Sequence, residues 1–480
     1  MQAYFGFEIH VELKTVSKMF CSCPVPSYEL SLKNPNTFIC PICVSHPGVL
    51  PSPNRKAIEY ALKVALALNT RINSSFIFSR KNYFYPDLPK NYQISQHQAL
   101  LGVDGEVSFP FEGRTLKVKI KDVHLEEDTA KLLYPEGRLK GATMVLVDFN
   151  RSGVPLLELV TYPFLATPQE GRSFLEELQR IIRFLGVGTG NMEEGAFRVD
   201  TNVSLPDEQG KPGVKTEIKN LNSFKSVERA LIYEIERQKS FLSRGQVLAQ
   251  ETRGFLEKEG VTVLQRRKEE ASDYRYFPDP DLPALPLEKP LLKDLRNSLP
   301  ILPGKLREEL ILLGLKEEHA FALTKDPETY YFFKDLLTVV GEPGETSSWV
   351  LTEVLGLLKE GRTMSNLPFT PLELGEVVLK VRKGEYTRGQ IKDAVRRSLE
   401  SGLSLKGVVE KIPPSVSAVE ELRLWVRKIL EEERGVVEEY LTGKDKAFNF
   451  LLGKVMRLSS GRADPGNARK VLEEELKKLK

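Results

Sequence analysis

Three ionisable side chains near the start of the chain have the spacing of a cation site. Glu8, His10 and Glu12 alternate with apolar residues through the segment 4–13. Strict alternation is the period of a β-strand with one buried face, so the three side chains project together, with Cα atoms roughly 6–7 Å apart. Two carboxylates and an imidazole can bind a divalent cation, although a solvated outer face is the commoner use of such a strand.

The polar alternation recurs in three later segments, and this recurrence favours a charged cradle. In 115–125 and the residues that follow, a regular strand would place His124 and Glu126 on one face and Glu127 on the other, whereas one bulge would exchange the two glutamates. Segments 198–205 and 214–220 carry the remaining one-sided polar sets: Arg198, Asp200, Asn202 and Ser204, then Lys215, Glu217 and Lys219. Carboxylates and bases gathered in this way suit metal ions and phosphates, and a solvated sheet face is the alternative.

All four cysteines lie in one window, as two close pairs. Cys21 and Cys23 form C-x-C, and Cys40 and Cys43 form C-x2-C after an interval of sixteen residues. Four thiolates on two turns can surround one tetrahedral zinc, and a reducing cytoplasm disfavours disulfides as the alternative. The spacing predicts a structural zinc site in the loop 20–44, because a closed site of four thiolates leaves no open position for catalysis.

Two segments combine aromatic and basic residues. Residues 80–90 read RKNYFYPDLPK, and residues 273–281 read DYRYFPDPD. Such segments suit the stacking of a base or the binding of phosphates, with a packed surface loop as the alternative. The chain has no P-loop, G-x-G-x-x-G, G-x-S-x-G or H-E-x-x-H motif. A bound nucleotide would therefore lie on the sheet with metal ions rather than at a glycine-rich helix start.

The elements that must position these residues divide the chain into two parts of different character. Strands are expected at 4–13, 115–125, 143–150, 198–205 and 214–220, and helices at about 54–69, 167–186 and 226–243. Seven prolines between 278 and 303 predict an extended connector packed on the first domain. Every later segment has a helical period, so we expect an α+β domain at 1–290, a helical domain at 291–405 and a helical tail domain at 406–480.

The bulk composition excludes several classes of protein. The chain has 480 residues, 41% of them hydrophobic and 28% charged, and a formal net charge of +3. These values are ordinary for a globular protein of roughly two to four domains. No apolar run reaches the roughly 18 residues of a membrane span, and no basic-then-apolar leader precedes Glu8. A cytoplasmic protein without membrane contact is the default expectation.

A local excess of positive charge marks the end of the chain. Residues 440–480 hold ten Lys and Arg against five Asp and Glu. An apolar stripe that includes Phe448 and Val455 predicts helices, and six basic residues dominate their surface: Lys446, Lys454, Arg457, Arg462, Arg469 and Lys470. A solvated basic helix is the commonest explanation of such a pattern.

The longest motifs of the chain resemble the B subunit of the tRNA-dependent amidotransferase, over the whole length. The segments that carry the resemblance are GFEIHVEL at 6–13, RKNYFYPDLPKNYQISQ at 80–96, HLEED at 124–128, DFNR at 148–151, EIKNLNS at 217–223, DYRYFPDPDL at 273–282 and KDKAFNFLLGKVMRLSSGRADP at 444–465. Members of this family convert Glu-tRNA(Gln) or Asp-tRNA(Asn) to Gln-tRNA(Gln) or Asn-tRNA(Asn). They work with an amidase subunit, which releases ammonia from glutamine, and with a small third subunit.

The resemblance implies a fold and a reaction. The first domain should be a mostly antiparallel sheet cradle related to the catalytic sheet of glutamine synthetase, followed by the helical and tail domains. The protein should use ATP and Mg²⁺ to phosphorylate the side-chain carboxylate of the misacylated tRNA, and ammonia from the amidase should then displace phosphate. Phosphoryl transfer depends on positioning and charge stabilisation, which agrees with a cradle that lacks an obvious nucleophile.

The resemblance also assigns expected roles to single residues. Glu8, His10 and one or both of Glu126 and Glu127 match positions that bind Mg²⁺. The residues expected to be catalytic are Glu8, His10, Lys81, Glu127, Asp200 and Glu217. Those expected to bind ATP are Arg80, Lys81, Arg151 and Lys219. The six basic residues of the tail are expected to contact the tRNA backbone, with an affinity that depends on salt.

One departure from the family pattern leaves the zinc ligands open. His46 places an imidazole just beyond Cys43, so either four thiolates or three thiolates with His46 can bind the metal. Two other functions stay open as well: a zinc-stabilised RNA-binding scaffold without catalysis, and a stand-alone ATP-dependent ligase. The motifs fit the formation of Gln-tRNA and of Asn-tRNA equally.

Overall fold

A computed structural model gives the fold and describes residues 1–135, 143–267, 273–358, 363–413, 419–442, 444–459 and 462–479. The chain forms two compact units, Met1–Lys305 and Leu306–Lys480. The first combines a large mixed sheet with helices, and the second consists of helices and connecting segments in its described part, so the expected α+β class is confirmed. None of the helices in these ranges is long and apolar enough to cross a membrane.

The first unit is built on one sheet of ten strands. In order across the sheet they are β15 (Val261–Arg267), β14 (Glu251–Leu256), β13 (Thr216–Lys219), β12 (Phe197–Ser204), β1 (Ala3–Glu12), β10 (Pro155–Thr161), β7 (Arg114–Glu127), β6 (Gly102–Phe111) and β2 (Arg71–Ile72), with β11 (Phe164–Ala166) paired to the start of β1. Neighbours are antiparallel except β13 and β14, which run parallel. The first predicted strand therefore lies in the middle of the sheet.

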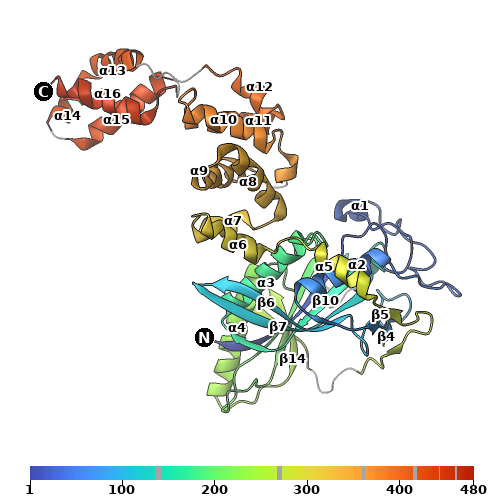
Figure 1. Ribbon diagram of the computed structural model, residues 1–480. Helices are drawn as coiled ribbons and strands as arrows, with labels where there is room; N and C mark the ends of the chain where they lie inside the picture. The colour runs from blue at the N-terminus through green and yellow to red at the C-terminus, as the bar shows by residue number, and fades with distance from the viewer. Residues whose placement is uncertain are drawn as a thin grey trace. The chain divides into compact units, whose positions relative to one another are not determined.

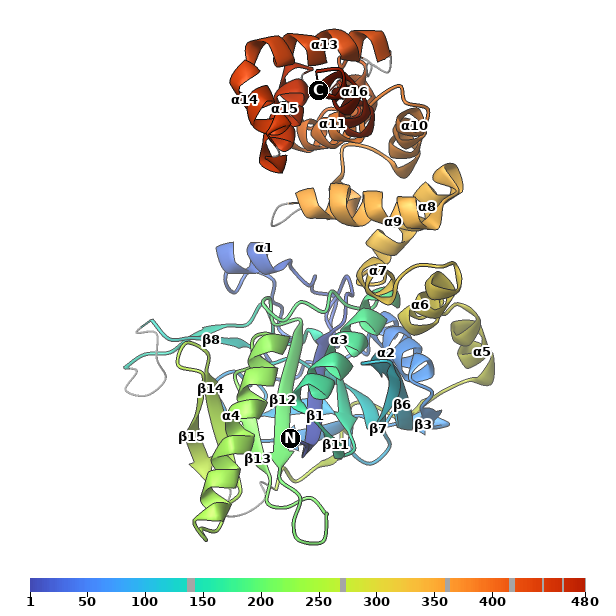
Figure 2. The same ribbon diagram turned by 90° about the vertical axis from the view of Figure 1, so that its left-hand side faces the viewer.

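The alternation of β1 packs one face of the sheet against helices. Phe5, Phe7, Ile9 and Val11 are buried in one core with α2 (Arg55–Ala67), α3 (Pro168–Phe184) and α4 (Phe224–Ser243). Helices α3 and α4 lie on the same side of the sheet (Figure 2). The start of α3 at a capping box formed by Thr167 is confirmed. The polar residues of β1 face the other side of the sheet.

A bulge in β7 decides which of its residues share this polar face. The pairing of β7 with β10 shifts by one residue, so that Lys121 is an extra residue in β7. Before the bulge the even-numbered apolar residues of β7 belong to the core, and after it the odd-numbered ones do. Glu126 consequently lies on the same face as His10, and Glu127 on the opposite one.

Short strands and the proline-rich segment pack beside the large sheet. The three-stranded sheet contains β16 (Phe277–Pro278), β4 (Ser79–Asn82) and β5 (Tyr92–Ser95), and two further pairs are β17 (Leu285–Pro286) with β3 (Ser75–Phe76) and β8 (Lys131–Leu133) with β9 (Leu146–Asp148). Within the expected strand at 143–150, only residues Leu146–Asp148 form a strand, β9. Helix α1 (Tyr28–Lys33) lies within the cysteine-bearing loop.

The expectation of a wholly extended connector at 278–303 is wrong in one place. Residues Lys289–Asn297 form helix α5, with Pro290 in its first turn. Proline is tolerated there because a backbone N–H in the first turn has no hydrogen-bond acceptor within the helix. Helix α5 lies beside α2 (Figure 1), and its Leu295 is buried in the core of the first unit. The first compact unit extends to Lys305. The expected domain boundary at 290 stays a prediction.

Helices make up the described part of the later chain. They are α6 (Pro303–Leu312), α7 (Glu317–Leu323), α8 (Pro327–Val340), α9 (Pro343–Ser348), α10 (Pro371–Arg382), α11 (Arg388–Ser401), α12 (Leu405–Val409), α13 (Val419–Glu432), α14 (Arg434–Leu441), α15 (Asp445–Leu458) and α16 (Pro465–Lys477). A π-helix at Trp349–Val354 and 3₁₀ turns at Leu355–Leu357 and Met364–Asn366 lie between α9 and α10. Helices α13 to α16 share an apolar core. The division at residue 405 stays a prediction.

Candidate active site

Five ionisable side chains from three adjacent strands meet on the polar face of the sheet. Glu8 and His10 come from β1, Glu158 from β10, and His124 and Glu126 from β7. Strand pairing brings them together, because His10 lies opposite Glu158 and Glu158 lies opposite His124. The Nε2 atom of His10 is 3.4 Å from Glu126 Oε1, 3.5 Å from Glu158 Oε2 and 4.0 Å from Glu8 Oε1. Together they form the carboxylate–imidazole cluster.

The members of the cluster shift one another's pKa values. Burial and the neighbouring Glu158 raise the pKa of Glu8 to about 7. Burial by itself would lower the pKa of His10, but Glu158 and Glu126 outweigh it and raise that pKa well above its usual value. Burial likewise opposes the ionised form of Glu158, yet His124 and His10 hold its pKa well below the usual range. Buried groups with opposed shifts are typical of sites that hold ions or transfer charge.

His124 links the cluster to a further buried carboxylate. Its Nδ1 atom is 2.9 Å from Asp122 Oδ1, and its Nε2 atom is 3.1 Å from Glu158 Oε2. Burial opposes protonation, but Glu158 and Asp122 raise the pKa of His124 to about 10. A charged imidazole held on both sides fixes the orientation of Glu158 toward His10.

The cluster has the donor atoms of a divalent-cation site. One ligand atom from each of Glu8, His10 and Glu158 lies within 4.8 Å of the other two, and the same holds for His124, Glu126 and Glu158. Glu126 Oε2 is buried and has no hydrogen-bond partner within the described part of the chain. An unpartnered carboxylate oxygen among other oxygen ligands suits a hard cation such as Mg²⁺.

Lys81 approaches the cluster from β4. Burial opposes its charged form, but Glu126, the Tyr276 phenol and Glu158 raise its pKa. Its Nζ atom also lies 5.2 Å from the centre of the Tyr274 ring. The structure thus brings Lys81 beside the cluster, where its ammonium can contact an oxygen of a phosphate or carboxylate.

Asp200, Glu217 and Lys219 lie on the other side of Glu8. Asp200 is opposite Glu8 in the pairing of β12 with β1. The Lys219 ammonium donates a hydrogen bond of 2.5 Å to Asp200 Oδ2 and is 3.2 Å from Glu217 Oε1. Burial opposes the charge of Lys219, but Asp200 and Glu217 raise its pKa. This group of three extends the charged face from the cluster to β13.

Glu127 lies apart from the other candidate metal ligands. Its carboxylate pairs with the Lys90 ammonium and accepts a hydrogen bond of 2.9 Å from the backbone N–H of Ile94. The side chain of Gln93 donates to the Glu127 carbonyl oxygen at 2.7 Å. Of the two adjacent glutamates, only Glu126 reaches the cluster, and Glu127 joins β7 to β5.

Two arginines expected to bind the nucleotide are engaged in other ion pairs. Arg80 contacts two aspartates of the segment 273–282, Asp279 at 2.8 Å and Asp281 at 3.0 Å, and so ties β4 to that segment. Arg151 Nε is 3.2 Å from Asp128 Oδ2 and lines a cavity at the end of β1. Neither arginine belongs to the carboxylate–imidazole cluster.

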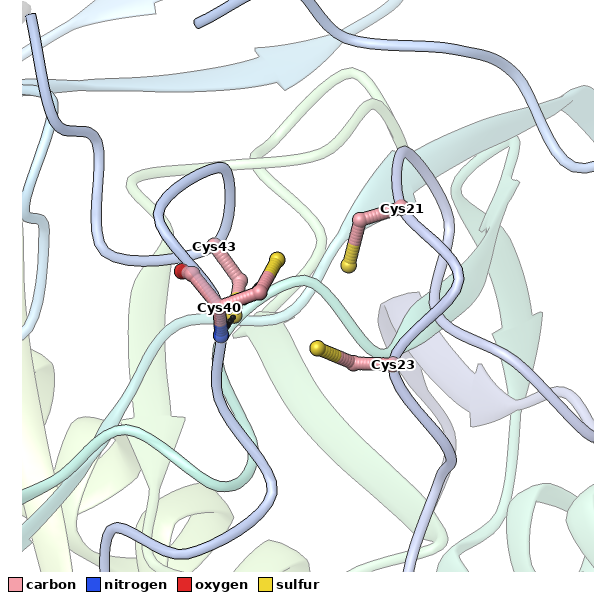
Figure 3. A group of neighbouring side chains, drawn as sticks. All are labelled: Cys21, Cys23, Cys40 and Cys43. Atoms are coloured by element: carbon pink, nitrogen blue, oxygen red, sulfur yellow. Dashed lines mark hydrogen bonds between the residues drawn. The ribbon is translucent and has the colours of Figure 1, made fainter.

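The four cysteines gather as the spacing predicts. Their side chains come from two turns and point toward a common centre, with sulfur atoms within 4.8 Å of one another (Figure 3). Cys43 Sγ accepts a hydrogen bond of 3.0 Å from the Cys40 backbone N–H, and hydrogen bonding from Cys21 lowers the pKa of Cys43 to about 4. Zinc with tetrahedral ligands at about 2.3 Å needs sulfur atoms about 3.8 Å apart, so the group is close to that geometry. The group does not include His46.

Five of the six basic residues expected to contact tRNA lie on α15 and α16, and Arg462 lies in the segment between these helices. The exposed ones are Lys446, Arg457, Arg469 and Lys470. Lys454 is half-buried and its Nζ atom is 2.8 Å from Glu433, while Arg462 lies 5.9 Å from the ring centre of Trp425. Their exposure is compatible with RNA contact and with a solvated helix surface alike.

Glu158 is the member of the cluster that none of the polar alternations or motifs in the sequence includes. It is the sole ionisable residue in the run VPLLELV at 154–160. A carboxylate buried in an apolar strand is destabilising unless it has partners, so an isolated Glu in such a run is a usable signal. The role of Asp122 behind His124 has no comparable signal, because it depends on the bulge in β7.

Comparison with known proteins agrees with the geometry. The sequence-family model of the GatB/GatE catalytic domain matches residues 3–293, and that of the GatB domain matches residues 331–476. The chain belongs to the GatB family. The B subunit of the aspartyl/glutamyl-tRNA(Asn/Gln) amidotransferase of Thermomicrobium roseum is 44% identical over 482 residues, which cover 99% of this chain and 98% of that protein. Proteins of the same name from Thermotoga maritima and Persephonella marina are each 41% identical and cover 98% of both chains.

The family match bears on both candidate sites. The carboxylate–imidazole cluster and the four cysteines lie inside the region that matches the GatB/GatE catalytic domain. The basic residues of α15 and α16 lie inside the region that matches the GatB domain. The resemblance to the B subunit of the amidotransferase is therefore confirmed at the level of the family.

Proposed function

We propose that this protein activates the side-chain carboxylate of Glu-tRNA(Gln) or Asp-tRNA(Asn) with ATP and joins it to ammonia. The carboxylate–imidazole cluster carries the proposal, because it gathers metal-ligand oxygens at one point and leaves one of them without a hydrogen-bond partner among the described residues. The substrate class is suggested by the relatives, which carry the name of the B subunit of aspartyl/glutamyl-tRNA(Asn/Gln) amidotransferase.

The reaction requires that a carboxylate become an acyl donor. A carboxylate oxygen of the substrate attacks the γ-phosphorus of ATP, the bond from that phosphorus to its bridging oxygen breaks, and ADP leaves. Ammonia then attacks the acyl carbon, the bond from that carbon to the phosphorylated oxygen breaks, and phosphate leaves while the nitrogen loses a proton. Catalysis of such a transfer rests on positioning and charge stabilisation rather than on a protein nucleophile.

Each part of the polar face has a role in this proposal. The residues proposed to hold Mg²⁺ are Glu8, His10, Glu126 and Glu158. When bound, Mg²⁺ neutralises charge on the phosphates. Lys81 binds the substrate carboxylate or the transferred phosphoryl group, and Lys219, kept charged by Asp200 and Glu217, contacts a phosphate. Glu127 positions Glu126 through its contacts with β5.

Zinc, partner subunits and tRNA belong to the same proposal. The four cysteines bind one structural zinc, which fixes the loop that follows β1. Ammonia comes from an amidase partner, a small third subunit completes the complex, and the basic tail contacts the tRNA backbone. The first unit then acts as a cradle related to glutamine synthetase, followed by a helical domain and a tail domain.

A single-turnover reaction tests the proposal. Full-length protein is mixed with ATP, Mg²⁺, ammonium and Glu-tRNA(Gln), with the amidase and third subunits present or omitted. We expect ADP and Gln-tRNA to form together, and only with the misacylated tRNA. Binding of tRNA without ADP, even with the partners present, would identify an RNA-binding scaffold. Full activity with free ammonium and no partners would identify a stand-alone ligase.

Matched glutamate variants separate the proposed roles. Glu126→Gln should abolish ADP formation and spare tRNA binding, because it removes the unpartnered oxygen that suits a cation. Glu127→Gln should slow the reaction without abolishing it, because Glu127 contacts β5 rather than the cluster. Glu376→Gln, on the exposed surface of α10, is the control. Equal loss in the two variants would refute the distinction between the adjacent glutamates.

A further inference from the structure

A large cavity lies at the end of β1, one step along the strand from the carboxylate–imidazole cluster, and has no part in the roles above. It encloses about 730 Å³ between the end of β1, the segment that contains α1, and residues 189–198. Glu12 lines it and is the next residue after His10 on the polar face of β1, about 7 Å along the strand. A molecule in this cavity therefore lies within reach of the point where the substrate carboxylate is proposed to react.

The lining of the cavity suits a nucleobase. Leu13, Met192 and Leu221 contribute apolar walls, and Tyr28 on α1 contributes a ring that is 46% exposed. Lys131 Nζ lies 5.4 Å from the centre of that ring. An accessible aromatic ring beside a cation, at the edge of a mostly apolar cavity, is the composition of a base-stacking surface.

An amide at the same cavity can read the edge of a base. Asn222 follows β13 and is exposed where it lines the cavity. A carboxamide can pair with both the amino group and a ring nitrogen of adenine. Asn150, the other amide of the lining, is buried and accepts hydrogen bonds of 2.9 Å from the backbone N–H groups of Thr37 and Phe38, so its role is to hold that loop.

The charge of the cavity argues against a triphosphate group. Arg151 and Arg198 line it, but both pair with Asp128. The formal charges of the lining cancel, with four basic and four acidic residues: Lys14, Lys131, Arg151 and Arg198 against Glu12, Asp148, Glu193 and Glu194. Because its lining has no net positive charge, the cavity by itself is better suited to a nucleoside with a single phosphodiester than to a triphosphate.

We propose that this cavity binds the 3′-terminal adenosine of the aminoacyl-tRNA, an inference that rests on the proposed function. The base stacks on Tyr28, Asn222 contacts its edge, and the attached aminoacyl group extends past Glu12 to the cluster. An extended glutamyl group is about as long as two residues of a strand, which matches the step from Glu12 to His10. ATP is the other source of an adenosine; its triphosphate would have to leave the cavity for the proposed Mg²⁺ site, and the parallel measurement of ATP binding distinguishes the two sources.

Binding of acceptor minihelices tests this assignment. Two RNAs that differ only in the terminal nucleotide, adenosine or cytidine, are titrated against the full-length protein by fluorescence anisotropy, and the Kd of ATP with Mg²⁺ is measured in parallel. The unmodified protein should prefer the adenosine end by about tenfold. Tyr28→Ala and Asn222→Ala should each reduce this preference severalfold and leave the Kd of ATP unchanged. Tyr331→Ala, a tyrosine of the second unit that is 47% exposed, should change neither quantity.

Each other outcome overturns the assignment. If both variants retain the preference for adenosine, the cavity does not hold the terminal nucleotide. If they retain it and bind ATP more weakly, the cavity belongs to the triphosphate. Two variants on separate elements guard against the misfolding of one. Because the readout is binding, a protein that shows the preference but forms no ADP would refute the proposed function alone, and one that forms Gln-tRNA without the preference would refute the cavity assignment alone.

Discussion

Neutralising Glu158 should disturb the carboxylate–imidazole cluster more than any conservative change at its edge. The Oε2 atom is 3.5 Å from His10 Nε2 and 3.1 Å from His124 Nε2, and the side chain is 9% exposed. At an effective dielectric constant of about 20, each such pair of unit charges is worth roughly 5 kcal/mol. Glu158→Gln removes these two attractions, which destabilises the fold. It also removes the free-energy cost of burying one carboxylate, which offsets part of that loss. We therefore expect a net loss of about 3–5 kcal/mol in the free energy of unfolding without metal.

The same substitution should lower the pKa of both imidazoles. Glu158 is a main cause of the raised pKa of His10 and of the value of about 10 for His124. The chain has five histidines, so their ring signals can be followed by NMR against pH, and denaturant unfolding gives the stability. The Mg²⁺ concentration for half-maximal activity should also rise at least about 10–100-fold. Unchanged histidine titration together with an unchanged unfolding midpoint would refute the pairing, and Glu376→Gln is again the control.

Three further predictions concern the cysteines, a buried aspartate and the tail. Cys43→Ser should remove bound zinc, measured by metal analysis, and lower the melting temperature, whereas full retention of zinc would exclude the four-thiolate site. Asp128→Asn should cost about 3 kcal/mol of unfolding free energy at pH 7, because Arg151 and Arg198 lower the pKa of this carboxyl although burial opposes its ionisation. That stability is present above the unfolded pKa of about 3.9 and is lost as pH falls through the folded value, so urea unfolding should show the difference shrinking below about pH 4, and a constant difference would contradict the ion pairs. Replacing Lys454 and Arg457 together by Ala should weaken tRNA binding and reduce the slope of log affinity against log salt by about one to two, and an unchanged slope would exclude the tail contact.

Features that depend on local periodicity could be predicted from the sequence. The alternation in β1 predicts the buried row of Phe7 and Ile9 and the polar row of Glu8 and His10, and the structure has both. The capping box at Thr167 likewise marks the start of α3. The grouping of the four cysteines could be predicted from their spacing alone, because two close pairs on two turns have few uses other than binding a metal.

Features that depend on pairing between strands could not be predicted in this way. The choice between Glu126 and Glu127 follows from the extra residue Lys121, and the sequence of β7 does not fix where a bulge falls. The apolar run around Glu158 indicates that its carboxylate has partners, but it does not indicate that these are the histidines of the two neighbouring strands. The sequence does not predict helix α5, because prolines argue against regular structure, although one proline is tolerated in a first turn.

The place of β1 in the sheet has a consequence for synthesis of the chain. Its two main partners are residues 155–161 and 197–204, so its hydrogen bonds cannot be completed until about 200 residues have left the ribosome. Until then a strand rich in phenylalanine and aliphatic residues has both edges open, an arrangement that favours pairing with another chain. Glu8, His10 and Glu12 interrupt that strand with polar side chains, which act against aggregation. We therefore expect the polar row of β1, which contributes Glu8 and His10 to the carboxylate–imidazole cluster, also to protect the nascent chain while the sheet is incomplete.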